Sequence, residues 1–281
     1  MPDITDADID AYLTSQNDFD LELFVYRQFN EHGWDARHGG AYTDRITGKA
    51  RQFDIRATKC RGVAVGRALV LRFAVECKAL TKECPLLVSC VPRTDAEANH
   101  EVIRVAGRPS KGEGYIEALR TRNDSALYPQ AEYVGKKTTQ IKHNPQQRNA
   151  PPYVSSDRDT FDKWAQAIAS LAELVELAGD DAPNIGVNET LTFALPILVV
   201  SDETLWKVEY DGQGARVGMP VLVDNVALYV DESYTAGRET YKVRHLQIFT
   251  RTGLGAFVDE LGGEKSQTIT RIFGFLGVGA K

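Results

Sequence analysis

The sequence lacks a hydrophobic run long enough to cross a membrane. Its best candidate, LTFALPILVV at 191–200, has about half of the ~20 apolar residues that a spanning helix needs. The acidic N-terminus, residues 1–20, has no basic start followed by an apolar stretch, so it does not form a secretory signal. We therefore expect a cytoplasmic protein with no membrane partner.

Cysteine is scarce, and the spacing of the cysteines argues against a zinc-binding protein and a disulfide-stabilised protein. The 281 residues include four cysteines, at positions 60, 77, 84 and 90. They form no CxxC pair, and no histidine pair lies nearby at finger-like spacing, so a zinc site is not favoured. A disulfide framework is not expected in a cytoplasmic chain. Cys77 lies in an apolar strand phase, and we interpret it as a small buried hydrophobic residue.

Three catalytic or nucleotide-binding motifs are incomplete. GKKT at 135–138 is similar to the end of a phosphate-binding loop, but Gln130 stands where the first glycine should be. Gly253 and Gly255 follow a predicted strand without the third glycine of a dinucleotide fingerprint. None of the five histidines lies in a nucleophile-elbow context, so a Ser-His-Asp hydrolase has little support.

The net charge of −6 hides a segregation of positive charge. Residues 37–72 contain nine Lys/Arg and two Asp/Glu, a local charge of +7. Residues 104–148 contain nine and four, a local charge of +5. Such blocks are ordinary solvated faces in one interpretation. In the other, the first block binds a polyanion, because it contains Asp54 and runs up to Glu76.

Periodicity and turn residues predict one α/β domain over 1–281. Its core comprises 18–92 and 155–262, and the polar stretch 93–152 is interpreted as an insertion with short helices at 114–122 and 136–143. The predicted long helices are 18–33, which Asp18 or Asp20 caps, and 160–180, and a short one closes the chain at 254–261. The predicted strands are two within 33–58, joined at Thr47-Gly48-Lys49, then 66–80, 84–91, 191–200, 204–211, 219–230 and 241–250.

One glutamate interrupts the apolar face of the first long helix. On a helical wheel Glu22 falls between Val25, Tyr26 and Phe29. Because an unpaired buried carboxylate is costly, Glu22 needs a partner. The alternative is an edge position from which the side chain reaches water.

Two predicted strands, in RQFDIRAT and LRFAVECKAL, carry charges among apolar residues. Alternation places Glu76 and Lys78 on the face opposite Cys77. If these strands pair, Asp54 joins Glu76 and Lys78, and the first helix can deliver Glu22. The alternative to a functional site is a structural salt bridge.

Carboxylates that meet at one point repel each other and need a cation. All-oxygen ligands favour a hard ion, so we expect Mg²⁺, or Mn²⁺ in its place. A lysine beside such a metal orients or helps to deprotonate an attacking water, and the metal neutralises charge in the transition state of phosphate hydrolysis.

The arrangement Asp54 … Glu76-Cys77-Lys78, preceded by a helix with Glu22, resembles the PD-(D/E)XK nuclease superfamily. The resemblance covers residues 18–92 and implies a restriction-endonuclease-like central mixed sheet flanked by helices. It implies that Asp54, Glu76, the Cys77 carbonyl and Glu22 ligate the metal and that Lys78 is the catalytic lysine. It also implies a polar residue on a later helix, for which Gln140 is the candidate.

This resemblance implies a Mg²⁺-dependent nuclease in a restriction, defence or repair role, with DNA a more frequent substrate than RNA. Phe53 departs from the family by replacing the proline of its motif. Cleavage of both DNA strands with one site per chain would suggest a homodimer. The alternative function is a catalytically inactive module of the same fold that binds nucleic acid or a protein.

The basic blocks supply the residues expected to bind the nucleic acid. We predict that they form two walls of one groove with the metal at its floor. The predicted contacts are Arg51, Arg56 and Lys59 on one wall and Lys136, Lys137 and Lys142 on the other; Arg37, Arg45, Lys49 and Arg61 flank the first wall.

Overall fold

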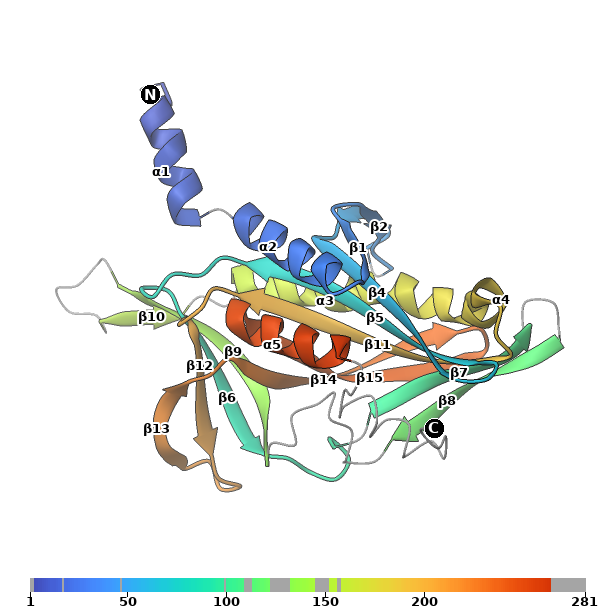
Figure 1. The fold of residues 1–281 in the computed structure, drawn as a ribbon. Helices are drawn as coiled ribbons and strands as arrows, with labels where there is room; N and C mark the ends of the chain where they lie inside the picture. The colour runs from blue at the N-terminus through green and yellow to red at the C-terminus, as the bar shows by residue number, and fades with distance from the viewer. Residues whose placement is uncertain are drawn as a thin grey trace.

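The computed structural model, shown in Figure 1, contains one large mixed β-sheet with helices on both of its faces. The sheet has 13 strands in the described part of the chain, and β2 and β3 form a separate two-stranded sheet. The described residues are 3–16, 18–45, 47–98, 100–108, 113–121, 132–144, 152–155 and 158–263.

The strand order is β1-β4-β5-β11-β15-β14-β9-β6-β12-β13, with β10 beside β9 and the β7–β8 pair beside β11. β5 and β15 both run parallel to β11, whereas β4 and β14 are antiparallel additions to them. The strands are β1 (Asp35–His38), β2 (Ala41–Thr43), β3 (Ala50–Gln52), β4 (Ile55–Ala64), β5 (Arg67–Lys78), β6 (Leu86–Pro92), β7 (His100–Arg108), β8 (Glu113–Thr121), β9 (Tyr133–His143), β10 (Tyr153–Ser155), β11 (Glu189–Val200), β12 (Leu205–Tyr210), β13 (Arg216–Leu222), β14 (Asn225–Ala236) and β15 (Glu239–Thr250).

The helices divide the core into separate layers. α2 and α5 pack on one face of the sheet, where Phe29 and Val258 meet Phe73, and α3 packs on the other, where Leu171 meets Ala74. Burial on both faces explains the nearly continuous apolar run of β11. The helices are α1 (Asp6–Gln16), α2 (Asp18–Glu31), α3 (Arg158–Leu177), α4 (Asp181–Ile185) and α5 (Arg251–Gly262), with a 3-10 turn at Ala178–Asp180.

Most of the elements expected on either side of residues 93–152 are confirmed. The helices predicted at 18–33 and 160–180 are α2 and α3, and α5 is the predicted closing helix. The predicted alternation in β5 is also confirmed, since Phe73, Val75 and Cys77 belong to the α2 and α5 layer. Two strand predictions are corrected. The structure divides the two strands predicted within 33–58 into the four strands β1 to β4, and it divides the strand predicted at 219–230 into β13 and β14, because the chain bends at residues 223–224.

The two short helices predicted in the middle of the chain are wrong. Residues 114–122 and 136–143 coincide with β8 and β9, as far as the structure describes them. In β9 the polar residues Thr138 and Gln140 both point inward, a period of two that a helix could not produce. The polar composition of residues 93–152 therefore led to a helix prediction for strands that belong to the main sheet.

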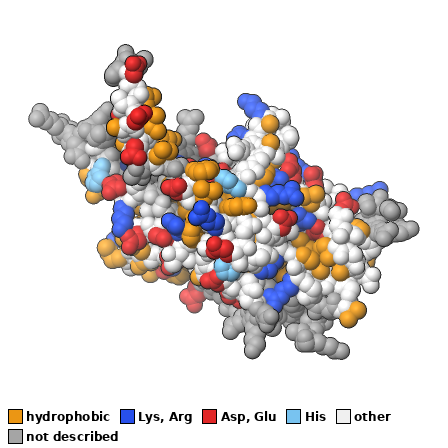
Figure 2. Space-filling model, turned by 45° about the horizontal axis from the view of Figure 1, so that its top comes forward, with side chains coloured by type: hydrophobic (Ala, Val, Ile, Leu, Met, Phe, Trp, Pro, Cys, Tyr) orange, Lys and Arg blue, Asp and Glu red, His pale blue; other side chains and the backbone are white. Residues whose placement is uncertain are grey.

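The sequence did not predict the N-terminal helix α1, which Figure 1 shows extending away from the sheet. Its side chains Ile9, Tyr12 and Leu13 are exposed, and Figure 2 shows apolar and acidic side chains on this projection. In the described residues, no helix is both long and apolar enough to cross a membrane.

Candidate active site

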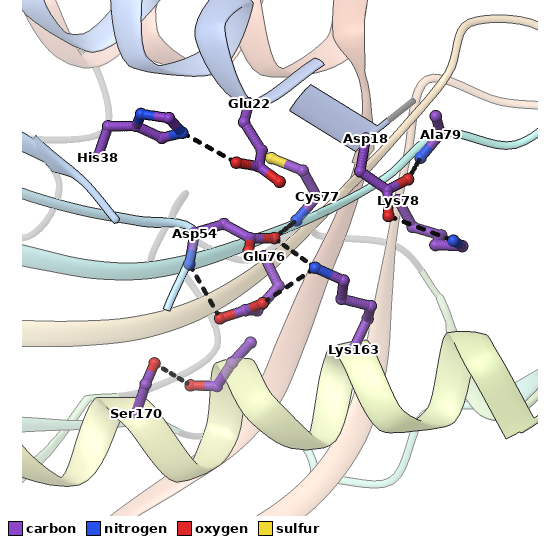
Figure 3. A network of polar contacts seen from close by, with 11 residues as sticks. Asp18, Glu22, His38, Asp54, Glu76, Cys77, Lys78, Ala79, Lys163 and Ser170 are labelled. Carbon is purple, nitrogen blue, oxygen red and sulfur yellow. Dashed lines mark hydrogen bonds and ion pairs between the residues drawn. The ribbon is translucent and has the colours of Figure 1, made fainter. Parts of the chain in front are cut away.

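Two carboxylates meet where β4 begins and β5 ends. The antiparallel register pairs Ile55 with Val75, so the preceding Asp54 lies beside Glu76. The Asp54 amide donates to Glu76 Oε1 at 3.4 Å. Both residues belong to the edge of the sheet face that α3 covers, as Figure 3 shows.

Backbone groups hold both the side chain and the main chain of Asp54 in place. Its Oδ2 accepts a hydrogen bond from the Cys77 amide at 2.8 Å. The Asp54 carbonyl accepts from the Gly39 amide at 2.8 Å, and the Phe53 amide donates to the Gly40 carbonyl at 3.0 Å. A Cβ on Gly40 would lie 2.5 Å from the Phe53 ring, so this close approach requires glycine.

The lysine that contacts the carboxylates is Lys163, from α3, which the sequence analysis did not identify. Its Nζ lies 2.8 Å from Asp54 Oδ2 and 3.6 Å from Glu76 Oε2. Lys163 shares a helical stripe with the buried residues Ala167 and Ser170. Glu22 was identified as a candidate site residue because it is a charged residue on an apolar helix face. The same criterion would have identified Lys163.

The site stores unfavourable electrostatic energy at Glu76, whose exposure is 0%. Burial raises the pKa of Glu76 well above its usual value, the Asp54 charge raises it further, and Lys163 only partly offsets these effects. Among the described residues, Glu76 Oε2 has no hydrogen-bond partner. Burial opposes the charge of Lys163, but Asp54 and Glu76 raise the pKa of the ammonium above its usual value.

Glu22 has the partner that its position requires. Its Oε2 lies 2.9 Å from His38 Nε2, and Figure 3 places the pair beside Cys77. After burial and Asp54, the charge of Glu22 contributes to raising the pKa of the Cys77 thiol. Glu22 therefore lies close to the strand end that carries the carboxylate pair.

Lys78 extends from the same strand end in a different direction. Its Nζ lies 3.3 Å from Asp18 Oδ2, and Asp18 Oδ1 accepts from the Ala79 amide at 2.7 Å. Figure 3 shows the Lys78 ammonium beyond Asp18 as viewed from the carboxylate pair. Asp18, expected only as a helix cap, also ties the start of α2 to the end of β5.

Gln140 does not lie on a helix, because residue 140 belongs to β9. Its amide nitrogen donates to the Cys84 carbonyl at 3.3 Å, and its oxygen accepts from Thr160 Oγ1 at 3.3 Å. Thr160 precedes Lys163 by one helical turn. Gln140 thus lies one side chain away from the helix that supplies the lysine of the site.

Several residues of the first predicted basic wall have partners within the protein. Arg51 pairs with Asp44, Arg56 with Glu173 and Arg45 with Glu176. Lys59 donates to the His32 carbonyl at 2.6 Å and Arg61 to that of Gly263 at 2.8 Å, whereas Arg37 and Lys49 are exposed.

The second predicted basic wall lies on β9. Lys136 pairs with Glu97 and lies 4.3 Å from the centre of the Tyr229 ring, Lys137 is exposed and Lys142 is half-buried. Because β5, β11, β15 and β14 separate β9 from β4, the structure does not support the two sets as facing walls of one groove. On the face in Figure 2, basic and acidic side chains are interspersed.

No group of three or more His, Cys, Asp or Glu residues is arranged to hold a metal within the part of the chain that the structure describes. The smaller set of Asp54, Glu76 and the Cys77 carbonyl fits an ion that takes its other ligands from water and substrate. The observation that favours such an ion is the buried Glu76 Oε2, which has no hydrogen bond in the described structure and lies 3.6 Å from the Lys163 ammonium.

No protein-family model, curated protein or solved structure matches this chain. Functional inference therefore depends on the site itself.

The first prediction concerns the turn that holds Asp54. Gly40→Ala should destabilise the protein by about 1–3 kcal/mol, because the new methyl group overlaps the Phe53 ring. Gly48→Ala is the matched control, since Gly48 also has a positive φ but nothing lies within 4 Å of its Cβ. Urea denaturation should show a larger loss for Gly40→Ala, and equal losses would contradict the steric role of this turn.

The second prediction concerns pH. The raised pKa of Glu76 means that ionising it disfavours the folded state, a penalty absent below the usual value of 4.5 that grows as pH rises. In EDTA at neutral pH, Glu76→Gln should stabilise the protein by about 1–3 kcal/mol, and the gain should vanish toward pH 4.5.

Glu97→Gln is the control of opposite sign. Burial opposes the charge of Glu97, but hydrogen bonds from Lys136 and Thr94 lower its pKa. Glu97→Gln should therefore destabilise the protein at neutral pH. Denaturant titrations at several pH values test both variants, and a Glu76→Gln variant less stable than the wild type at pH 7 would refute the electrostatic argument.

Proposed function

We propose that this chain is a Mg²⁺-dependent nuclease with a restriction-endonuclease-like form of the mixed sheet. The observation that carries the proposal is the carboxylate pair of half-buried Asp54 and fully buried Glu76, in which Glu76 Oε2 has no hydrogen bond among the described residues and only the Lys163 ammonium at 3.6 Å. A structural salt bridge would be expected to bring the ammonium to hydrogen-bonding distance of that oxygen, because a buried carboxylate oxygen without a hydrogen bond is costly. A site that binds a cation can retain such an unfavourable oxygen, because the cation would contact it when bound.

Asp54, Glu76 and the Cys77 carbonyl are the groups that would hold the ion. Mg²⁺ accepts one or two carboxylates and takes water and phosphate oxygens for its remaining positions. When bound, it supplies a water of lowered pKa and charge neutralisation at the phosphoryl oxygens. The chain orients its own ligands beforehand, since the Cys77 amide holds Asp54 Oδ2 and the Gly39 amide holds the Asp54 backbone.

The two lysines have different parts in this proposal. Lys163 is the counter-ion of the carboxylates in the metal-free chain, because its ammonium contacts both of them. Lys78 is the lysine that the resemblance assigns to the attacking water, and Asp18 holds its ammonium at the end of β5. Glu22, oriented by His38, completes the acidic surroundings of this strand end.

DNA is the preferred substrate class in this proposal, with RNA the alternative, and defence or repair is the role that the family resemblance supports. A second candidate function is a nuclease-fold module that binds nucleic acid or a protein without chemistry. The observation that favours it is Lys163, which already provides the carboxylates with a cation.

The third prediction tests hydrolysis directly. Labelled duplex DNA, single-stranded DNA and RNA are incubated with Mg²⁺ and the wild type, Asp54→Asn, Glu76→Gln or Lys78→Met. Asp54→Asn and Glu76→Gln should each lower the rate by at least about 100-fold, because each removes a charge that the cation requires. Lys78→Met should lower turnover without changing metal affinity.

Glu209→Gln is the matched control, because Glu209 is a half-buried, ion-paired carboxylate on β12, remote from β5 in the strand order. It should cleave as the wild type does. Wild-type protein that cleaves none of the three substrates, with Mn²⁺ as with Mg²⁺, would exclude the nuclease and favour the binding module.

The fourth prediction separates the roles of the two lysines. An ammonium 2.8 Å from Asp54 competes with a metal for the same oxygen, so Lys163→Met should tighten Mn²⁺ binding in calorimetry by about tenfold. Lys78→Met should leave this affinity unchanged. Weaker Mn²⁺ binding in Lys163→Met would mean that Lys163 supports the metal site instead of competing with the metal.

A further inference from the structure

A cavity of about 480 Å³ lies beside the carboxylate pair, on the same face of the sheet. We refer to it as the arginine cavity, because Arg37 of β1, Arg56 of β4 and Arg72 of β5 line it. Apolar groups complete its wall, among them Phe53 and Leu174. Its volume is in the range of small-ligand sites, and its lining combines few charged groups with apolar surface, as such sites do.

The strand register places this cavity next to the candidate active site. Asp54 and Arg56 are two residues apart on one strand face, so their Cα atoms are about 7 Å apart. Successive phosphates of one DNA strand advance ~3.4 Å each along the helix axis. A nucleic-acid strand whose phosphate lies at Asp54 therefore reaches the arginine cavity within a few nucleotides.

The opposition of Arg37 and Arg56 across two strands does not contribute to folding stability. Arg37 and Arg56 are directly opposite each other in the β1–β4 pair. Like charges at directly opposed positions destabilise a sheet. Arg37 has no ion-pair or hydrogen-bond partner for its side chain among the residues described. A site that binds an anion accounts for this repulsion, because the anion would pair with both guanidinium groups.

Three acidic residues reduce the positive charge that the cavity presents, and one of them, Asp35 of β1, lines the cavity itself. Glu173 accepts from Arg56 at 2.8 Å, and Asp181 pairs with Arg72. Arg56 nevertheless keeps a buried Nε with no hydrogen-bond partner in the described structure, and its guanidinium lies 4.2 Å from the centre of the Phe53 ring. Arg37 is thus the arginine of the cavity that has no ion pair among the described residues, with the Asp35 carboxylate in the same lining, and Arg56 is partly neutralised by Glu173.

Building on the proposed nuclease function, we infer that the arginine cavity binds a backbone phosphate of the nucleic-acid strand near the phosphodiester that is hydrolysed. Arg37 and Arg56 pair with this phosphate, and Glu173 moderates the affinity by occupying one side of Arg56. The cavity thereby sets the register of the strand relative to Asp54 and Glu76.

The fifth prediction uses binding without metal, so that it does not depend on hydrolysis. A fluorescent 20-nucleotide single-stranded DNA is titrated in EDTA with the wild type, Arg37→Gln or Arg216→Gln. Arg216 is the matched control, since it is an exposed arginine on β13, the opposite edge of the sheet. Arg37→Gln should weaken binding about tenfold and lower the salt slope by about one unit, whereas Arg216→Gln should change neither.

Glu173→Gln provides a gain of function that a purely structural ion pair would not give. Release of Arg56 should tighten DNA binding about threefold. Gln can still accept from the Thr43 amide, which donates to Glu173 Oε1 at 3.2 Å. Glu209→Gln, which releases Lys207 from an equivalent ion pair, controls for the general loss of negative charge.

The result that would overturn the inference is a DNA affinity and salt slope unchanged in Arg37→Gln. Competition by inorganic phosphate identifies the source of the ligand: phosphate binding that depends on Arg37, with DNA binding that does not, would make this a free-anion site and refute the inference. Loss of hydrolysis on mutation of Glu76, with Arg37→Gln binding DNA normally, would leave the nuclease proposal standing while this one fails.

Discussion

The repulsion between the fully buried Glu76 and the half-buried Asp54 is the interaction around which this end of the molecule is organised. Asp54 and Glu76 are adjacent because β4 and β5 pair in a fixed register, so the sheet cannot separate them without losing its central hydrogen bonds. Burial raises the pKa of Glu76 well above its usual value, and the charge of Asp54 raises it further. A rigid sheet can hold such an unfavourable pair, because β5 and β11 are buried on both faces over most of their length.

Helix α3 connects the features that the proposals use. Near its N-terminus Lys163 contacts the carboxylates, and further along the Ser170 carbonyl and Glu173 accept from Arg56. Its last turn, with Leu174, lines the arginine cavity. One helix thus contacts both the carboxylate pair and the arginines, so a nucleic-acid strand that follows α3 would meet the two proposed sites in succession.

Sequence reasoning located the carboxylates because strand alternation has a period of two, so a charged residue on a face that should pack is easily recognised. It missed Lys163, because the apolar stripe of α3 was used to predict the helix but not to find the charged residue that lies on its buried side. It also predicted helices where β8 and β9 lie, because their many polar residues show little of the apolar alternation that marks a strand. The pairing of β9 with β6 and β14 is set by distant parts of the chain, which a local pattern does not contain. The direction of Lys78 depends on Asp18, a tertiary contact that no local pattern contains.

The central claim is that the Asp54–Glu76 pair exists to bind a divalent cation. Diffraction from a crystal soaked in Mn²⁺, with anomalous data, tests it most directly. The account predicts an anomalous peak in contact with Asp54 and Glu76, together with a Lys163 side chain that has moved away from both carboxylates. A Lys163 ammonium that remains between them, with no peak at the pair in saturating Mn²⁺, would contradict the account and leave a structural ion triad.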